Sequence, residues 1–383
     1  MPPPTCVHTA EHLLHWLALR LTPGLGARKT TLLLERFGSP EAIFRASPTE
    51  LEAAGLPGSA ARSLASGCAF EDAAEQQERL KATGTQVVTF TDANYPPQLR
   101  QIYDPPPLLF AQGRVELLET VMVAMVGSRR PSTYGVVAAE HLAIDLAKAG
   151  VTVSSGMAKG IDTAAHLGAL NAGGGTCAVF GCGLDIIYPA ENRKLAARIA
   201  AEGLLLSEFP LGTPAHPQNF PIRNRIVSGL SDGVVVVEGV QYSGSLITAR
   251  LALDQNKEVF AVPGNITSKL SFGPNLLLKQ GAQLVQSAAD ILDGLSWETR
   301  SKLARQAELP LEEPAGQDPG PMAGIASQVL SLLKVDTPLH LDSLLEHLLD
   351  CSPSEVIATL FELELRGQVR QLPGRSYVKV WYE

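Results

Sequence analysis

Two arginines, Arg223 and Arg225, lie just before the apolar run VVVV in the stretch FPIRNRIVSGLSDGVVVVEG, residues 220–239. Their forked guanidinium groups match the oxygens of a phosphate. Phe220 precedes them, and arginines beside an aromatic ring suit single-stranded nucleic acid, whose phosphates pair with cations while its bases stack. The alternative for Phe220 is a place in the core. We expect both arginines to point into a binding crevice beside the buried strand.

Small residues follow five of the apolar runs that we expect to be strands. Ligands of open α/β sheets bind beyond the carboxyl ends of the strands. There, small residues let backbone amides approach, and helix N-termini favour anions. Arg129 and Lys159 lie inside two of these loops, so we predict an anion-binding crevice. No G-x-G-x-x-G fingerprint occurs, and no cofactor is expected. The five loops begin at Gly127, Gly156, Gly181, Ser243 and Gly264.

Acidic and basic side chains near these loops offer an enzymatic alternative. Asp162 and His166 lie four residues apart on an expected helix and could face each other. Asp162 is better explained as a first-turn carboxylate that accepts hydrogen bonds from free amides. Glu238 could be a base toward a ribosyl bond, as in a nucleotide or phosphosugar hydrolase, or could accept hydrogen bonds from the SGS loop. Because neither a nucleophile elbow nor a metal motif occurs, we assign no catalytic residue and no metal site.

The apolar pattern of the sequence predicts the secondary structure that surrounds these residues. Between residues 81 and 295, near-continuous apolar strands alternate with helix-length segments, which is typical of a parallel sheet covered on both faces. We therefore predict a doubly wound Rossmann-like α/β domain. The strands expected are TQVVTF, VMVAMVG, VTVSSG, TCAVFG, LLLSEF, GVVVVEG, EVFAVPG and AQLV.

Three further segments flank this domain. Residues 1–80 contain short helices, two of which begin at Ser-Pro pairs, and predict a small helical domain of the SAM or helix-hairpin-helix class. Its segment GLGARKTT is not a Walker A loop, so it is either a helix-to-helix turn or a hairpin whose amides contact a DNA phosphate. Residues 296–322 read as a polar linker. Residues 323–383 predict helices and a hairpin, the winged-helix pattern.

Composition limits the class of protein. The chain has 383 residues, 45% of them hydrophobic, and a net charge of −8. This charge argues against a general polyanion binder but permits a local basic groove. The five scattered cysteines indicate reduced thiols. We expect a cytoplasmic protein without membrane insertion, because neither a signal segment nor a bilayer-length apolar run is found.

Six motifs occur in order: VGSRRPSTYG, SGMAKGIDTAAH, FGCGLDIIYPAEN, FPIRNRI, SGSLITA and VPGN. Together they resemble the DNA-processing protein A family, also called DprA or Smf, over about residues 90–285. The resemblance implies a Rossmann-like binder of single-stranded DNA that acts in natural transformation. Such a protein protects incoming strands, helps to load a RecA-type recombinase and forms a homodimer through its Rossmann-like domain. It would be a recombination mediator and not an enzyme.

The resemblance also implies which residues contact the strand. One loop would hold backbone phosphate, the RNR segment would line the strand's path, and further loops would shape the same pocket. These three sets are Gly127, Ser128 and Arg129; Phe220, Arg223, Asn224 and Arg225; and Lys159, Ser243, Gly244, Ser245 and Thr248.

The expected winged-helix module is acidic. Residues 322–383 contain 5 Lys and Arg against 8 Asp and Glu. Insertion of this module into a DNA groove would meet phosphate repulsion. We expect it to contact protein, or to contact DNA weakly through Arg370, Arg375 and Lys379.

Overall fold

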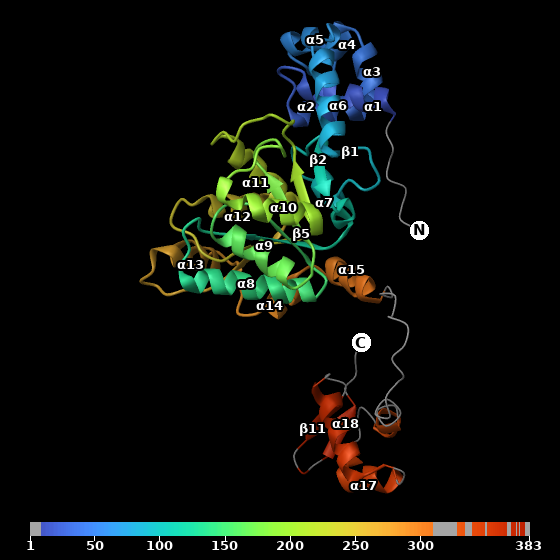
Figure 1. The fold of residues 1–383 in the computed structure, drawn as a ribbon, viewed down its shortest axis with the longest axis vertical. Helices are drawn as coiled ribbons and strands as arrows, with labels where there is room; N and C mark the ends of the chain where they lie inside the picture. Colours follow the sequence, from blue (N-terminus) through green and yellow to red (C-terminus); the bar gives the residue numbers. More distant parts are fainter. Residues whose placement is uncertain are drawn as a thin grey trace. The chain divides into compact units, whose positions relative to one another are not determined.

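The computed structural model describes residues 9–308, 328–333, 339–348, 351–365, 369–372, 374 and 376–379. Contacts divide the chain into two units, Met1–Leu309 and Pro310–Glu383, which are described separately (Figure 1).

A nine-stranded sheet forms the centre of the first unit, in the order β1-β2-β6-β5-β4-β3-β7-β8-β9. All neighbours from β6 to β9 pair in parallel, whereas β2 is antiparallel to both β1 and β6. The chain winds outward from β3 in both directions, so the switch point lies between β3 and β7. The strands are β1 Gln86–Thr89, β2 Leu108–Gly113, β3 Met122–Val126, β4 Thr152–Ser155, β5 Thr176–Phe180, β6 Leu204–Ser207, β7 Gly233–Val236, β8 Glu258–Ala261 and β9 Gln283–Leu284.

Helices cover both faces of this sheet, which confirms the predicted doubly wound fold. Along β3, Val123 and Met125 pack in one apolar cluster with residues of α8, α9 and α14. Met122 and Ala124 pack in another cluster with residues of α11, α12 and α13. Alternate side chains thus face opposite layers, and both layers are apolar. The helices are α8 Thr133–Lys148, α9 Ile161–Asn171, α10 Arg193–Glu202, α11 Asn219–Leu230, α12 Gly244–Asp254, α13 Phe272–Lys279 and α14 Ala288–Gly294.

Between residue 9 and the sheet, six helices gather around the buried Trp16. Ser39 and Ser47 cap two of them, as the Ser-Pro pairs predicted, and Glu50 completes a capping box with Ser47. Figure 1 shows these helices in blue beside the sheet end that carries β1 and β2, with whose residues they share an apolar cluster. They are α1 Ala10–Leu21, α2 Ala27–Phe37, α3 Pro40–Arg45, α4 Pro48–Ala53, α5 Gly58–Ala65 and α6 Phe70–Thr83.

The segment GLGARKTT forms a helix-to-helix turn followed by the start of α2, with Gly26 as the N-cap. Contact of its amides with DNA stays a prediction. The domain boundary at residue 80 also stays a prediction, since the helices and the sheet belong to one contact unit.

Short elements complete the first unit. The first part of the segment predicted to be a linker is helical, because α15 spans Trp297–Glu308. Residues 309–322 of that segment lie outside the described part. The others are α7 Pro97–Arg100, η1 Val115–Glu119, η2 Ala190–Asn192 and η3 Lys269–Ser271.

The second unit is a small helical module with a three-stranded sheet in the order β10-β12-β11. Its buried core includes Val356, Leu360 and Tyr377. Of the wing residues, Lys379 is exposed, while Arg375 and the side chain of Arg370 lie outside the described residues. The elements described in full are β10 Leu339–His340, α17 Leu341–His347, α18 Pro353–Leu365, β11 Val369–Leu372 and β12 Ser376–Lys379, and residues 328–332 are also helical. No described helix in either unit has the length and apolarity that a bilayer-spanning segment needs.

Candidate nucleic-acid interface

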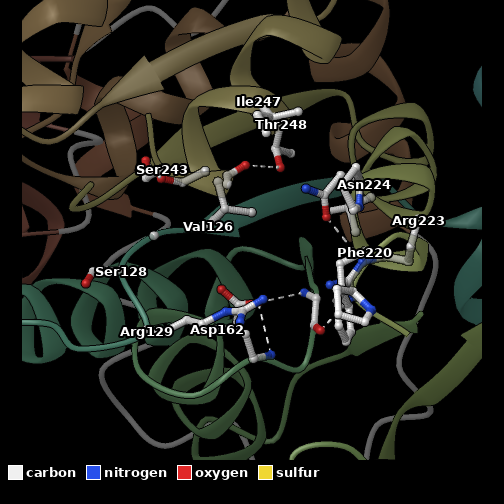
Figure 2. A pocket seen from close by; sticks show the side chains of 18 of the residues that line it. Val126, Ser128, Arg129, Asp162, Phe220, Arg223, Asn224, Ser243, Ile247 and Thr248 are labelled. Carbon is white, nitrogen blue, oxygen red and sulfur yellow. Dashed lines mark hydrogen bonds between the residues drawn. The ribbon is translucent and has the colours of Figure 1, made fainter. Parts of the chain in front are cut away.

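A cavity of about 470 Å³ opens beyond the carboxyl ends of β3, β4 and β7, at the switch point (Figure 2). A smaller cavity of about 250 Å³ shares part of its lining and adds Lys159. Arg225 lines neither. The predicted residues that line the larger cavity are Gly127, Ser128, Arg129, Phe220, Arg223, Asn224, Ser243, Gly244, Ser245 and Thr248.

The loop after β3 carries the most accessible cation of this cavity. Gly127 lets the loop pack on α9, because a Cβ there would lie 2.6 Å from Cγ1 of Ile161. The Ser128 carbonyl accepts a hydrogen bond from Ile161 N at 3.2 Å, and its hydroxyl accepts one from Arg130 N at 3.1 Å. Arg129 extends over Phe220, with 5.6 Å between its guanidinium carbon and the ring centre. Among the described residues, no carboxylate forms an ion pair with Arg129.

Helix α11 places Phe220 and Arg223 over two glycine positions. A Cβ at Gly181 would lie 2.9 Å from Cδ1 of Phe220, and a Cβ at Gly156 would lie 2.6 Å from Nη2 of Arg223. Arg223 donates hydrogen bonds to the carbonyls of Gly156, at 2.5 Å, and Val179. Burial lowers the pKa of Arg223 to about 10, so the side chain stays cationic at neutral pH. Its charge thus sits at the strand ends.

Arg225 faces away from the cavity, contrary to the expectation from the sequence. Two residues along an α-helix correspond to a rotation of about 200°, so Arg223 and Arg225 lie on opposite sides of α11. Arg225 Nη2 donates to Glu208 Oε2 at 2.6 Å, and Arg225 Nε lies 2.9 Å from Asp104 Oδ2. With 8% of its side chain exposed, Arg225 belongs to a buried ion-pair network.

The N-terminus of α12 supplies the opposite wall of the cavity. Ser243 is the N-cap residue, and its hydroxyl bonds to that of Ser245 at 2.8 Å. Thr248 Oγ1 donates to the Gly244 carbonyl at 3.2 Å. Figure 2 shows Ser243 and Thr248 across the cavity from Arg129. Since first-turn amides of a helix have no intrahelical partner, this wall favours an anion.

The candidate catalytic residues are engaged in structural contacts. Asp162 accepts hydrogen bonds from Gly156 N and Ala158 N, both at 3.1 Å. Burial raises the pKa of Asp162, and the charge of Arg223 opposes that rise.

The sequence allowed Asp162 and His166 to face each other, but His166 does not bond to Asp162. Its Nδ1 instead lies 2.7 Å from Thr176 Oγ1. Glu238 accepts hydrogen bonds from Ser132 N at 2.9 Å and Ser132 Oγ at 2.5 Å, and not from the SGS loop. The lining of the larger cavity does not include Glu238. The described residues contain no cluster of three or more potential metal ligands.

Tyr188 is a cavity residue that the sequence interpretation missed. It lines both cavities and is 46% exposed. Its ring centre lies 5.4 Å from that of Phe220, with 32° between the ring planes. The signal that could have identified Tyr188 is its place in FGCGLDIIYPAEN, a glycine-rich segment that follows a buried strand. The sequence analysis predicted no binding residue in that motif.

Comparison with known proteins identifies two matching families. The family of DNA recombination-mediator protein A matches residues 86–296, and the DprA winged helix domain matches residues 312–375. Protein Smf of Escherichia coli K12 is 43% identical over 296 residues, which cover 75% of each chain. DNA processing protein DprA of Bacillus subtilis is 44% identical over 213 residues, or 55% of this chain and 72% of that protein. Protein Smf of Synechocystis is 31% identical over 390 residues and covers 95% of this chain and 98% of the relative.

Two solved structures share the fold. The X-ray structure of DNA processing protein A from Streptococcus pneumoniae has a TM-score of 0.64 and 34% identity, and the match covers 74% of this chain and 98% of that one. The structure of the Helicobacter pylori protein, described for its single-stranded DNA binding mode, has a TM-score of 0.50 and 36% identity, over 54% of this chain and 94% of that one.

Proposed function

This chain belongs to the family of DNA recombination-mediator protein A, or DprA/Smf, and on that premise we propose that it binds single-stranded DNA as a non-catalytic mediator. The observation that carries the proposal is the meeting of Arg129, Phe220, Arg223 and the N-terminus of α12 around one cavity. The binding mode named for the Helicobacter pylori relative supports it.

Each wall of the cavity would recognise a different part of the strand. The loop of Ser128 and Arg129 and the N-terminus of α12 present cationic and amide donors, which suit phosphate. Phe220 and Tyr188 present ring faces for stacking of unpaired bases. Arg223 is held by two carbonyls, so it would act through its charge and through the placement of α11. Gly127, Asn224, Gly244, Ser245 and Thr248 would shape the pocket, and Lys159 would extend it.

Family membership is what supports our proposal for the role in the cell. We propose that the protein protects incoming strands during natural transformation in the cytoplasm and helps to load a RecA-type recombinase. A homodimer formed through the Rossmann-like domain would hold two such cavities. The acidic winged-helix module would contact protein in preference to DNA, because phosphate repels its carboxylates. Domain boundaries at residues 80, 295 and 322 are part of this proposal.

The test is the affinity of a fluorescent oligo-dT, measured by anisotropy over a range of salt. We expect Arg129→Ala to weaken binding and to reduce the slope of log K against log salt by roughly 0.7 to 1, the value for one lost phosphate contact. Arg198→Ala is the matched control, because Arg198 pairs with Glu202 on α10 and lines neither cavity. A duplex of equal length should bind more weakly, since paired bases cannot stack on Phe220.

Two results would contradict the proposal. One is wild-type affinity and salt slope in Arg129→Ala, and the other is equal retention of single and double strands. Turnover of mononucleotides by the wild-type protein would support the alternative hydrolase function.

A further inference from the structure

The ammonium group of Lys159 is already engaged by a carboxylate. Lys159 lines the smaller cavity together with Arg129, Arg130 and Arg223. Its Nζ donates a hydrogen bond to Glu191 Oε1, in an ion pair whose side chains are 52% and 64% exposed. A ligand that enters this cavity therefore meets three arginines and one lysine whose charge is offset by Glu191.

The fold holds Glu191 beside this cavity. Asn192, the next residue, is 7% exposed, and its Nδ2 donates to Met157 O and Thr163 Oγ1, both at 3.0 Å. On the other side, Tyr188 and Pro189 line the same cavity. The backbone of Glu191 is thus fixed against the loop that carries Lys159, so this ion pair differs from a chance pairing of two long surface side chains.

A carboxylate and a phosphate offer an ammonium group the same kind of anionic oxygen. An exposed ion pair is weak, so the lysine can exchange one partner for the other at little cost. We propose that Glu191 is an internal competitor for Lys159, and that a phosphate of the bound single strand displaces its carboxylate. This inference rests on the proposed function. Glu191 then lowers the affinity of the site and eases release of the strand.

The hydrogen bond from Lys159 lowers the pKa of Glu191. The carboxylate is therefore fully ionised over the neutral range, where it competes with the strand.

A double-mutant cycle tests the competition directly. The affinity of a fluorescent oligo-dT is measured for wild type, Glu191→Gln, Lys159→Ala and the double variant in the same low-salt buffer. We expect Glu191→Gln to tighten binding by about two- to fivefold, the range of an exposed ion pair. In the Lys159→Ala background the same change should have no effect, because the competed cation is absent. Glu191→Ala repeats the cycle with a side chain that cannot accept a hydrogen bond from Lys159.

Glu202→Gln is the matched control. Glu202 pairs with Arg198 on α10 and is 50% exposed, so the variant makes the same change in net charge away from both cavities. We expect its affinity to equal that of wild type, and thermal melting of every variant shows whether it is folded.

The outcomes separate this inference from the proposed function. Equal tightening by Glu191→Gln with and without Lys159 would show general repulsion and overturn the competition. Wild-type affinity in both Glu191 variants, with weaker binding in Lys159→Ala, would overturn it as well while leaving the proposed function intact. Absence of oligonucleotide binding by the wild-type protein would instead overturn the proposed function.

Discussion

Arg223 and Arg225 show how two like residues acquire different roles from one helix. Arg223 reaches the strand ends and the cavity, whereas Arg225 is buried against Glu208 and Asp104. Arg20 of α1 donates to the Glu208 carbonyl at 3.2 Å, which ties the N-terminal helices to the same network. The charge of Arg225 thus stabilises the position of α11, and only Arg223 contributes its charge to the cavity.

Replacement of Arg225 should therefore reduce stability. We expect Arg225→Ala to lower the free energy of unfolding by about 3–5 kcal/mol, because the carboxylate of Glu208 would remain buried without its partner. Arg129→Ala should change it by less than about 0.5 kcal/mol, the usual range for a surface substitution. Urea denaturation followed by circular dichroism measures both. If the Arg225→Ala protein were as stable as wild type but no longer bound the oligonucleotide, Arg225 would have to contact DNA directly, contrary to this prediction.

Among the secondary-structure elements, helix α9 is linked to strand β5 by a hydrogen bond between a neutral His166 and Thr176. The Thr176 hydroxyl donates its single proton to Val153 O at 2.7 Å, so His166 Nδ1 must donate to Thr176 Oγ1. His166 Nε2 is then unprotonated, and it is buried without a hydrogen-bond partner. Protonation would place a charge there, so burial, aided by the charge of Arg223, lowers the pKa of His166 to about 3.

This depressed pKa predicts a loss of stability in acid. Below the unfolded-state pKa of about 6.5, His166 is protonated in the unfolded chain but stays neutral in the folded chain. The free energy of unfolding should therefore decrease as the pH is lowered from about 6.5 toward about 3, and His166 should contribute at most about 1.4 kcal/mol per pH unit to this decrease. His166→Gln, which can donate to Thr176 but does not titrate, should flatten the profile of unfolding free energy relative to wild type. The exposed His141→Gln is the control, and parallel profiles for His166→Gln and wild type would contradict the argument.

The elements were predictable where the sequence pattern is local. Apolar runs predicted the parallel strands. Of the five loops predicted from the small residues after them, four contribute residues to the cavities at the switch point, and the loop that begins at Gly264 does not. Strand β2 was missed, since LLFAQG follows three prolines and pairs antiparallel with β6, far along the chain. Local patterns contain no signal for the Glu238–Ser132 contact, whose partners are 106 positions apart. The direction of Arg225 follows from α11, which begins at Asn219 and therefore carries both arginines on one helix, two residues apart.

At the scale of the whole molecule, binding must depend on local charge and not on net charge. The chain carries a formal charge of −8, yet the smaller cavity is lined by Arg129, Arg130, Lys159 and Arg223. A cleft lined by one sign of charge focuses the field regardless of the total. The second unit, residues 310–383, holds 11 Asp and Glu against 5 Lys and Arg, so its net charge of −6 is most of the total of −8.

Removal of the second unit should therefore preserve the binding of single strands. Both cavities are formed within residues 126–248, inside the first unit. We expect a chain of residues 1–309 to bind oligo-dT within about twofold of the full-length affinity, with an unchanged salt slope, because no phosphate contact is lost.

The salt dependence of binding distinguishes three ways in which this prediction could be wrong. A shallower slope in the shortened chain would show that basic residues of the wing contact phosphate, as Lys379 could. An unchanged slope with weaker binding would show that the second unit acts on the first without touching DNA. Tighter binding at low salt only would reflect the loss of the repelling carboxylates, whose influence is screened beyond about 10 Å at 0.1 M salt. Full-length Glu346→Gln with Glu355→Gln controls for that charge effect, since both carboxylates lie in the second unit and neither is in its core.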